Sequence, residues 1–322
     1  METVLNAAKK GELAILETLI DAKTDIEAKD EEGNTALIWA ACNGHATCTA
    51  LLIRAKANLE AQDHRFGETA LMWASRNGHA ACVQLLLDAS ADIETTNHNG
   101  MTALRWAASD GHATCVQLLL DAKSEICRRD RFGYNPLMRA VFDGHETCAQ
   151  LLLDANADVN EKDDCGDTPL IWASFNGHDA CIRVLVEANA DLEAKDLGGS
   201  TGLILAANNG HTACVQRLLG VKADIEAKDN DGNTPLMVAV SFDRTACAQL
   251  LVDSKANIKA QNNQSESPLM CAARDGHTAC VQLLIDAKIK SEEKDRGNPA
   301  PWAWSLLQSF YSFLAWVRGN DR

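Results

Sequence analysis

The sequence is poor in basic residues and in proline, and each shortage argues against a class of protein. Lysine and arginine total 30 against 45 acidic residues, which gives a formal net charge of −15. Proteins that bind the nucleic-acid backbone need clustered Lys and Arg, so we expect no nucleic-acid partner. A basic or apolar protein surface is the more natural complement. With six prolines, 46% hydrophobic and 23% charged residues, the composition is that of a folded chain.

Targeting and catalytic signatures are also lacking. Residues 1–6 have neither the basic start nor the apolar stretch of a secretion signal, so we predict a cytoplasmic protein. No Ser-His-Asp arrangement, P-loop or Gly-x-Gly-x-x-Gly pattern stands in a credible context. Acidic residues recur at one repeated position, but repeated charge is typical of a solvated helix face. We therefore predict no enzymatic activity and no cofactor.

The dipeptide Gly-His dominates the sequence, because it returns seven times at a nearly fixed interval. Successive copies are 34, 33, 33, 33 and 33 residues apart, and the last gap of 66 is two periods. Fixed spacing over many copies predicts an array of stacked repeats, in which each unit buries its apolar face against its neighbours. The pairs are Gly44-His45, Gly78-His79, Gly111-His112, Gly144-His145, Gly177-His178, Gly210-His211 and Gly276-His277.

Each copy has the pattern of a turn, a short helix, a sharp turn and a longer helix. In the copy that starts at residue 229, Asp-Asn-Asp-Gly predicts a turn. Thr234 is a good N-cap and Pro235 a good first helical residue. In the preceding copy, Gly210 is suited to end the first helix in the left-handed conformation. The second helix there has apolar residues at helical spacing, Cys214, Val215, Leu218 and Leu219.

This unit resembles the ankyrin repeat. The resemblance rests on the Thr-Pro-Leu sequences at 168–170 and 234–236, the Gly-His pairs, the leucine run 118–120 and Ala-Asp-Val-Asn at 157–160. It covers residues 1–294 as nine units: a truncated capping unit, 1–29, and full units that start near 30, 63, 97, 130, 163, 196, 229 and 262. It implies an all-α solenoid of stacked helix-turn-helix units with short hairpin tips. It also implies a non-catalytic scaffold or adaptor whose hairpin tips and first helices form a concave face for a partner protein.

Most of the twelve cysteines occupy one position of the repeat and are not expected to form disulfides. Equivalent positions in neighbouring units lie roughly 10 Å apart, the usual distance between packed helices, whereas a disulfide needs Cα atoms within about 7 Å. We predict buried, reduced thiols. The recurring His-x-x-Cys does not predict metal binding, because zinc requires four ligands and each unit offers two. The cysteines in this position are Cys48, Cys82, Cys115, Cys148, Cys181, Cys214, Cys247 and Cys280.

The sequence departs from the family pattern at several positions. The histidine that usually follows Thr-Pro-Leu is absent, so we expect its hydrogen bonds to be missing and apolar packing to compensate. Tryptophan fills the next position in four units, where it can bury a large area. The eighth unit has Asp243-Arg244 in place of Gly-His, which predicts a weaker joint because glycine fits that turn best. The substituted histidine positions hold Ile38, Met72, Arg105, Met138, Ile171, Ile204, Met237 and Met270.

The candidate binding residues lie in the third to sixth repeats, where positions that are small or polar in other repeats hold cationic or aromatic residues. Arg and Tyr are enriched at binding hot spots, and Arg beside aromatic residues in adjacent units should form one area. Their basic character predicts an acidic or phosphorylated partner segment. The alternative is neutral variation at solvated loop positions, with the phenylalanines packed between hairpins. The candidate residues are Arg65, Phe66, Arg76, Met101, Arg105, Arg131, Phe132, Tyr134, Arg139, Phe142 and Phe175.

The repeat pattern stops before a C-terminal segment, 295–322, that predicts an aromatic amphipathic helix. Residues 302–317 carry no charge, and their polar residues fall on one helical stripe, Ser305, Gln308, Ser309 and Ser312. Sixteen residues span about 24 Å, short of the roughly 30 Å hydrocarbon core. A cap on the last repeat, attachment to a membrane surface, and partner or self-association stay open. The alternative function is therefore a membrane-peripheral adaptor; we otherwise expect a monomer.

Overall fold

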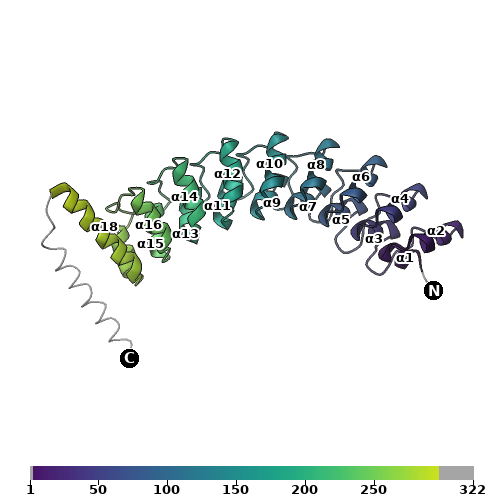
Figure 1. Ribbon diagram of the computed structural model, residues 1–322, viewed down its shortest axis with the longest axis horizontal. Coiled ribbons are helices and arrows are strands. Elements are labelled where there is room, and N and C mark those ends of the chain that lie inside the picture. Colours follow the sequence, from purple (N-terminus) through teal and green to yellow (C-terminus); the bar gives the residue numbers. More distant parts are fainter. Residues whose placement is uncertain (1–2, 297–322) are drawn as a thin grey trace, which may run out of the picture. The chain divides into compact units, whose positions relative to one another are not determined.

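The computed structural model describes residues 3–296, which form helices joined by turns, without a strand in that range. The chain divides into two compact units, one up to Asp191 and one from Leu192. The described helices repeat as short and longer pairs (Figure 1), so the prediction of an all-α ankyrin-type solenoid is confirmed. The predicted helix 302–317 lies outside the described residues.

The first unit contains six helix pairs. Within it, the first helices of neighbouring repeats pack against each other, and so do the second helices. The helices are α1 (Val4–Lys10), α2 (Leu13–Asp21), α3 (Ala36–Cys42), α4 (Ala46–Arg54), α5 (Ala70–Arg76), α6 (Ala80–Asp88), α7 (Ala103–Ser109), α8 (Ala113–Asp121), α9 (Pro136–Phe142), α10 (Glu146–Asp154), α11 (Pro169–Asn176) and α12 (Asp179–Glu187).

The second unit continues the same arrangement. Here α13 packs against α15 and α15 against α17, while α14, α16 and α18 form the second row. The helices are α13 (Gly202–Asn209), α14 (Thr212–Gly220), α15 (Pro235–Ser241), α16 (Thr245–Asp253), α17 (Pro268–Arg274) and α18 (Thr278–Arg296).

The helix boundaries follow the predicted start and stop signals. The Thr234 hydroxyl accepts a hydrogen bond from the backbone N–H of Met237, and Pro235 is the first residue of α15. This satisfies a backbone donor that has no partner inside the helix. At the other end, Gly210 terminates α13 with φ +80°, a conformation that glycine adopts without steric cost.

The Gly-His pair links each repeat to the one before it. The ring of His79 lies over Gly44, and its Nε2 is 3.0 Å from the carbonyl oxygen of Cys42. A Cβ atom on Gly44 would lie 2.6 Å from His79 Nδ1. The glycine therefore both ends a helix and leaves room for the next histidine. The same bond joins His45 to Lys9, His112 to Arg76, His178 to Phe142 and His277 to Ser241.

The repeated cysteines form part of the core, as predicted. All eight are buried with free thiols, and they pack in the same layer as second-helix residues such as Leu86 and Leu119. Burial raises the pKa of Cys115 to about 11, because an apolar environment disfavours the thiolate. Burial of this kind keeps the Cys115 thiol protonated.

The joint at Asp243 is strained, and an arginine takes over the role of the missing histidine. Asp243 has φ +54°, in the left-handed region that side chains disfavour. Arg244 lies over Gly210 as the histidines do elsewhere, and its Nε donates to the carbonyl oxygen of Asn208 at 2.9 Å. The link between repeats is thus kept, while the backbone strain stays.

Replacing Asp243 by glycine should therefore stabilise the protein. We expect Asp243→Gly to raise the free energy of unfolding by about 0.5–1 kcal/mol, because it removes the left-handed strain. The matched control is Gly78→Ala, which should lower it by roughly 1 kcal/mol or more, because Gly78 has φ +74° and a Cβ there would lie 2.5 Å from His112 Nδ1. Urea denaturation of the full chain measures both. A lower midpoint for Asp243→Gly would contradict the strain argument.

Candidate protein-binding surface

Four tryptophans occupy the same position on the first helices, next to the hairpin turns. Trp39 lies on α3, Trp73 on α5, Trp106 on α7 and Trp172 on α11, and each is half-buried. Arg139 holds the equivalent position on α9. Because first helices of neighbouring repeats pack side by side within the first unit, this position forms a row along the hairpin side of that unit. We call it the tryptophan row.

Three of the four indoles, those of Trp39, Trp73 and Trp172, are each hydrogen-bonded to the turn that precedes them. Trp39 Nε1 donates to Asp30 Oδ2 at 2.8 Å, while Asp30 Oδ1 accepts the backbone N–H groups of Glu32 and Asn34. Burial raises the pKa of Asp30, but these hydrogen bonds outweigh it and hold the pKa below its usual value. Equivalent bonds join Trp73 to Asp63, Trp172 to Asp163 and Arg139 to Asp130.

These bonds add to the apolar packing that was expected to compensate for the missing histidines. The tryptophans supply hydrogen bonds as well as buried area, and a signal for this was present: an aspartate stands nine or ten residues before each tryptophan involved. The fourth repeat has Asn97 in place of that aspartate. Its Trp106 Nε1 is buried without a hydrogen-bond partner among the described residues.

Aromatic side chains of the fifth and sixth repeats gather into one continuous surface. Ring centroids are 5.6 Å apart for Tyr134 and Trp172, 5.2 Å for Phe142 and Trp172, and 6.1 Å for Trp172 and Phe175. Phe142 is 36% exposed and Phe175 46%. Phe132, on the same hairpin as Tyr134, is 54% exposed. We call these five residues the aromatic surface; the phenylalanines are not enclosed between hairpins.

Two of the candidate arginines are held by carboxylates of the chain itself. Arg139 forms an ion pair with buried Asp130 and lies 4.6 Å from the Tyr134 ring centroid. Arg76 lies 3.5 Å from Glu68, a fully buried carboxyl whose pKa burial raises. The charge of both arginines is therefore largely neutralised within the fold.

Arg65 and Arg131 differ, because both are exposed on hairpin tips. Neither has a carboxylate within ion-pair distance among residues 3–291. The Arg65 guanidinium lies 4.8 Å from the Phe66 ring centroid, and Arg131 lies 5.2 Å from that of Phe132. Phe66 is half-buried against Trp73, with centroids 6.4 Å apart.

Met101 and Arg105 do not reach the surface and are left out of the candidate set. Met101 is 5% exposed and Arg105 is fully buried. The reason is positional: Arg105 stands where Met72 and Met138 pack in the core. Its Nη2 bonds the carbonyl of Gly100, but Nε and Nη1 have no hydrogen-bond partner among the described residues. Burial lowers the pKa of Arg105 to about 10, because desolvation disfavours its charge.

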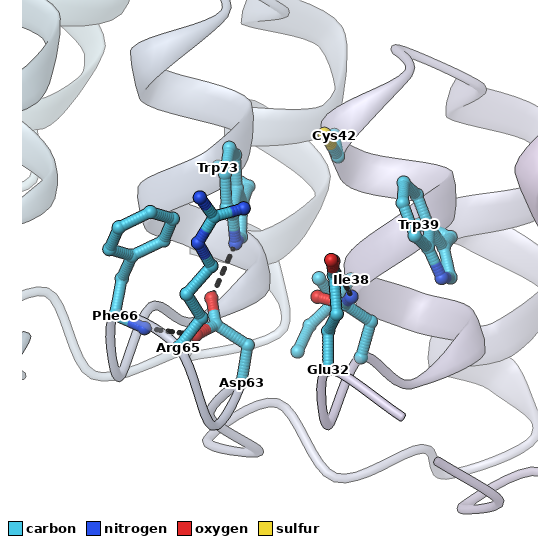
Figure 2. Close-up of a pocket in the computed structure, with 9 residues that line it drawn as sticks. Glu32, Ile38, Trp39, Cys42, Asp63, Arg65, Phe66 and Trp73 are labelled. Atoms are coloured by element: carbon cyan, nitrogen blue, oxygen red, sulfur yellow. Dashed lines mark hydrogen bonds between the residues drawn. The ribbon is translucent and has the colours of Figure 1, made fainter. Parts of the chain in front are cut away.

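A small pocket of about 70 Å³ opens in the tryptophan row between the second and third repeats. Figure 2 shows Trp39 and Trp73 on its two sides, with Cys42 and Glu32 between them in this view. Asp63 and Arg65 line the same pocket. No group of three or more His, Cys, Asp or Glu side chains in the described part of the chain could hold a metal ion. Across those residues, no helix is both long and apolar enough to cross a membrane.

Comparison with known proteins yields one family model, described as ankyrin repeats (3 copies). It matches residues 4–97, 90–163, 128–196, 155–229 and 203–295. Among curated proteins, 57 residues are 40% identical to Ankyrin repeat domain-containing protein 29 of Danio rerio, 17% of this chain and 19% of that protein. A further 58-residue match is 41% identical to Cortactin-binding protein 2 of Dasypus novemcinctus, 18% of this chain and 4% of that protein. The chain thus matches only a small part of either relative.

The buried charge of Arg105 should lower the stability of the fold, and this can be tested by substitution. Replacing it with the methionine found at the same position in two neighbouring repeats should raise the free energy of unfolding by about 1–3 kcal/mol, because the burial cost of a charged side chain with unbonded donors disappears. The control is Arg139→Met, which should destabilise the protein, because it leaves the Asp130 carboxylate buried without its partner. Urea denaturation measures both; destabilisation by Arg105→Met would count against this interpretation.

Proposed function

We propose that this chain, which belongs to the ankyrin repeat family, is a non-catalytic scaffold or adaptor that binds a partner protein through its aromatic surface. Ankyrin repeats are in general protein–protein interaction modules. The observation that carries the proposal is the continuous contact of Tyr134, Phe142, Trp172 and Phe175. Exposed apolar groups gathered on one patch are typical of a binding site, and Tyr and Trp are common hot-spot residues.

The surface is preorganised, which favours tight binding. Trp172 is held by its 2.9 Å bond to Asp163, and Tyr134 lies beneath the Arg139 guanidinium. Side chains that are fixed before association lose less conformational entropy when the partner binds. Energy from burying the exposed faces of Phe132, Phe142 and Phe175 is then available for affinity.

The proposed partner segment is acidic or phosphorylated. This part of the proposal depends on Arg65 and Arg131, because Arg76 and Arg139 already pair with carboxylates of the chain. An exposed guanidinium can hold a carboxylate or phosphate with two parallel hydrogen bonds. We further propose a cytoplasmic monomer, since buried free thiols suit a reducing compartment.

Loss of the aromatic surface should abolish capture of the partner. We expect the triple variant Arg131→Ala, Phe132→Ala, Tyr134→Ala to lose, in an affinity pull-down, a protein that the unaltered chain retains. Removing two or three hot-spot residues typically costs several kcal/mol, a drop of roughly 100-fold or more in affinity. Quantitative comparison of the captured proteins by mass spectrometry is the measurement.

A matched control and a second variant keep this test decisive. Gln84→Ala with Gln117→Ala alters exposed side chains of the second helices and should leave capture unchanged. Tyr134 is half-buried, so Phe132→Ser with Phe175→Ser tests exposed side chains alone, after circular dichroism shows both variants folded. Equal capture by all variants would reject the aromatic surface as the binding site.

A membrane-peripheral adaptor is the second candidate, favoured by the uncharged, tryptophan-rich segment 302–317. Such a segment can lie in the membrane interface with its apolar face buried. We expect the full chain to sediment with anionic liposomes and a chain truncated after residue 295 to stay in the supernatant. If both distribute equally, the membrane tether is rejected, and the segment is left to capping or association.

A further inference from the structure

In the tryptophan row, three of the four indoles meet a side chain from the repeat before them. Lys9 Nζ lies 3.8 Å from the Trp39 ring centroid, and the Arg76 guanidinium lies 4.1 Å from that of Trp106. Phe142 contacts Trp172 with centroids 5.2 Å apart. Residues at this position, three after the tryptophan row, recur at intervals of 33 or 34. We call them the covering position.

Cys42 is the exception at the covering position. Cys42 follows Trp39 by three residues and precedes the repeat that contains Trp73. Arg76 has the same position relative to Trp73 and Trp106. The Cys42 side chain is too short to cover an indole, and the pocket of about 70 Å³ lies there, lined by Trp39, Cys42 and Trp73 among others. Figure 2 shows the short Cys42 side chain set back on α3 while the two indoles border the open space.

Both indoles already contact a cation of the chain itself. Lys9, from the first repeat, covers Trp39, and the Arg76 guanidinium lies 5.3 Å from the Trp73 ring centroid and 4.1 Å from that of Trp106. Trp39 and Trp73 both line the pocket, so each indole also borders the open space between them (Figure 2). An indole face carries a negative quadrupole potential that attracts cations.

The charges around the pocket also favour a cation. Glu32 is exposed at its edge, and the Asp63 carboxylate lies below Trp73, whose Nε1 it accepts at 2.9 Å. Arg65 is the single cation that lines the pocket, and its guanidinium lies over Phe66. Two carboxylates against one guanidinium leave the local charge negative.

We propose that the pocket between Trp39 and Trp73 binds an arginine side chain of a partner, which fills the place that Arg76 fills one repeat later. Arginine is favoured over lysine because the pocket has two indole sides, and a planar guanidinium can contact both. The chain itself provides the precedent, since Arg76 contacts two indoles and Lys9 contacts one. This site lies apart from the aromatic surface, and it does not depend on the function proposed for that surface.

A blocked Gly-Arg-Gly peptide, titrated into the full chain up to the millimolar range, tests the proposal. The indole N–H signals of Trp39 and Trp73, assigned by single Trp→Phe variants, should shift and saturate in NMR spectra. The Trp106 signal should stay in place, because the faces beside it are already occupied by Arg76. Blocked Gly-Lys-Gly should bind more weakly, and Gly-Glu-Gly should not bind.

The decisive variant is Cys42→Arg, which copies the covering residue of the next repeat into the pocket. It should weaken peptide binding roughly tenfold or more, as expected when a cation site between aromatic faces is lost. Cys42→Ser keeps the side chain short and should bind as the unaltered chain does. Two exposed positions should change binding in opposite directions through their charge: Glu32→Gln should weaken binding about threefold, and Arg65→Ala should strengthen it.

Several outcomes would overturn the proposal. They are the absence of saturable shifts at Trp39 and Trp73, undiminished binding by folded Cys42→Arg, and an equal response to the glutamate peptide. Tighter binding of the lysine peptide would overturn the assignment to arginine. If Cys42→Arg does not fold, unchanged affinity in both Glu32→Gln and Arg65→Ala would equally reject it. None of these results bears on capture through the aromatic surface, so the two proposals fail separately.

Discussion

The stacking of one histidine ring on the glycine of the preceding repeat is the contact on which the rest of the structure depends. His79 packs where Gly44 has no side chain, and its Nε2 bonds the backbone of Cys42. The contact combines a left-handed turn residue, which is glycine in most repeats and Asp243 in one, with a ring of fixed reach, so it sets the distance and register of neighbouring repeats together. Once the register is set, equivalent residues of adjacent first helices must lie in rows. The tryptophan row and the buried cysteines both follow from this register.

A second constraint connects the binding surface to the fold. The hairpin aspartates accept backbone N–H groups with one oxygen and an indole or guanidinium with the other, as Asp163 does for Cys165, Asp167 and Trp172. The turn conformation and the orientation of the surface indole are therefore determined by one carboxylate. This explains how aromatic side chains that are only half-buried can keep a fixed orientation before a partner binds. It also explains why the fourth repeat, with Asn97, has a tryptophan whose N–H has no such partner.

The architecture was predictable from the sequence because the repeats share the same residues that start and end helices. Thr234, Pro235 and Gly210 each carry a local conformational preference that the structure uses directly. Side-chain partners were less predictable, because they depend on residues in the neighbouring repeat. Arg105 looks like a surface residue by type, yet its position is a core position. The pocket at Cys42 was not predictable from one repeat alone, because it depends on which side chain of one repeat reaches the indole of the next.

The residues that hold the repeats together also determine the chemistry of their surface. Lys9, Cys42, Arg76 and Phe142 each use the backbone carbonyl to bond a histidine of the next repeat. Their side chains are not needed for that bond, so they can differ without moving the backbone. The same position thus presents an ammonium, a thiol, a guanidinium and a phenyl ring beside the four indoles of the tryptophan row. A uniform scaffold can in this way carry different binding chemistry in each repeat. A partner that contacts several repeats is then selected by the order of these side chains.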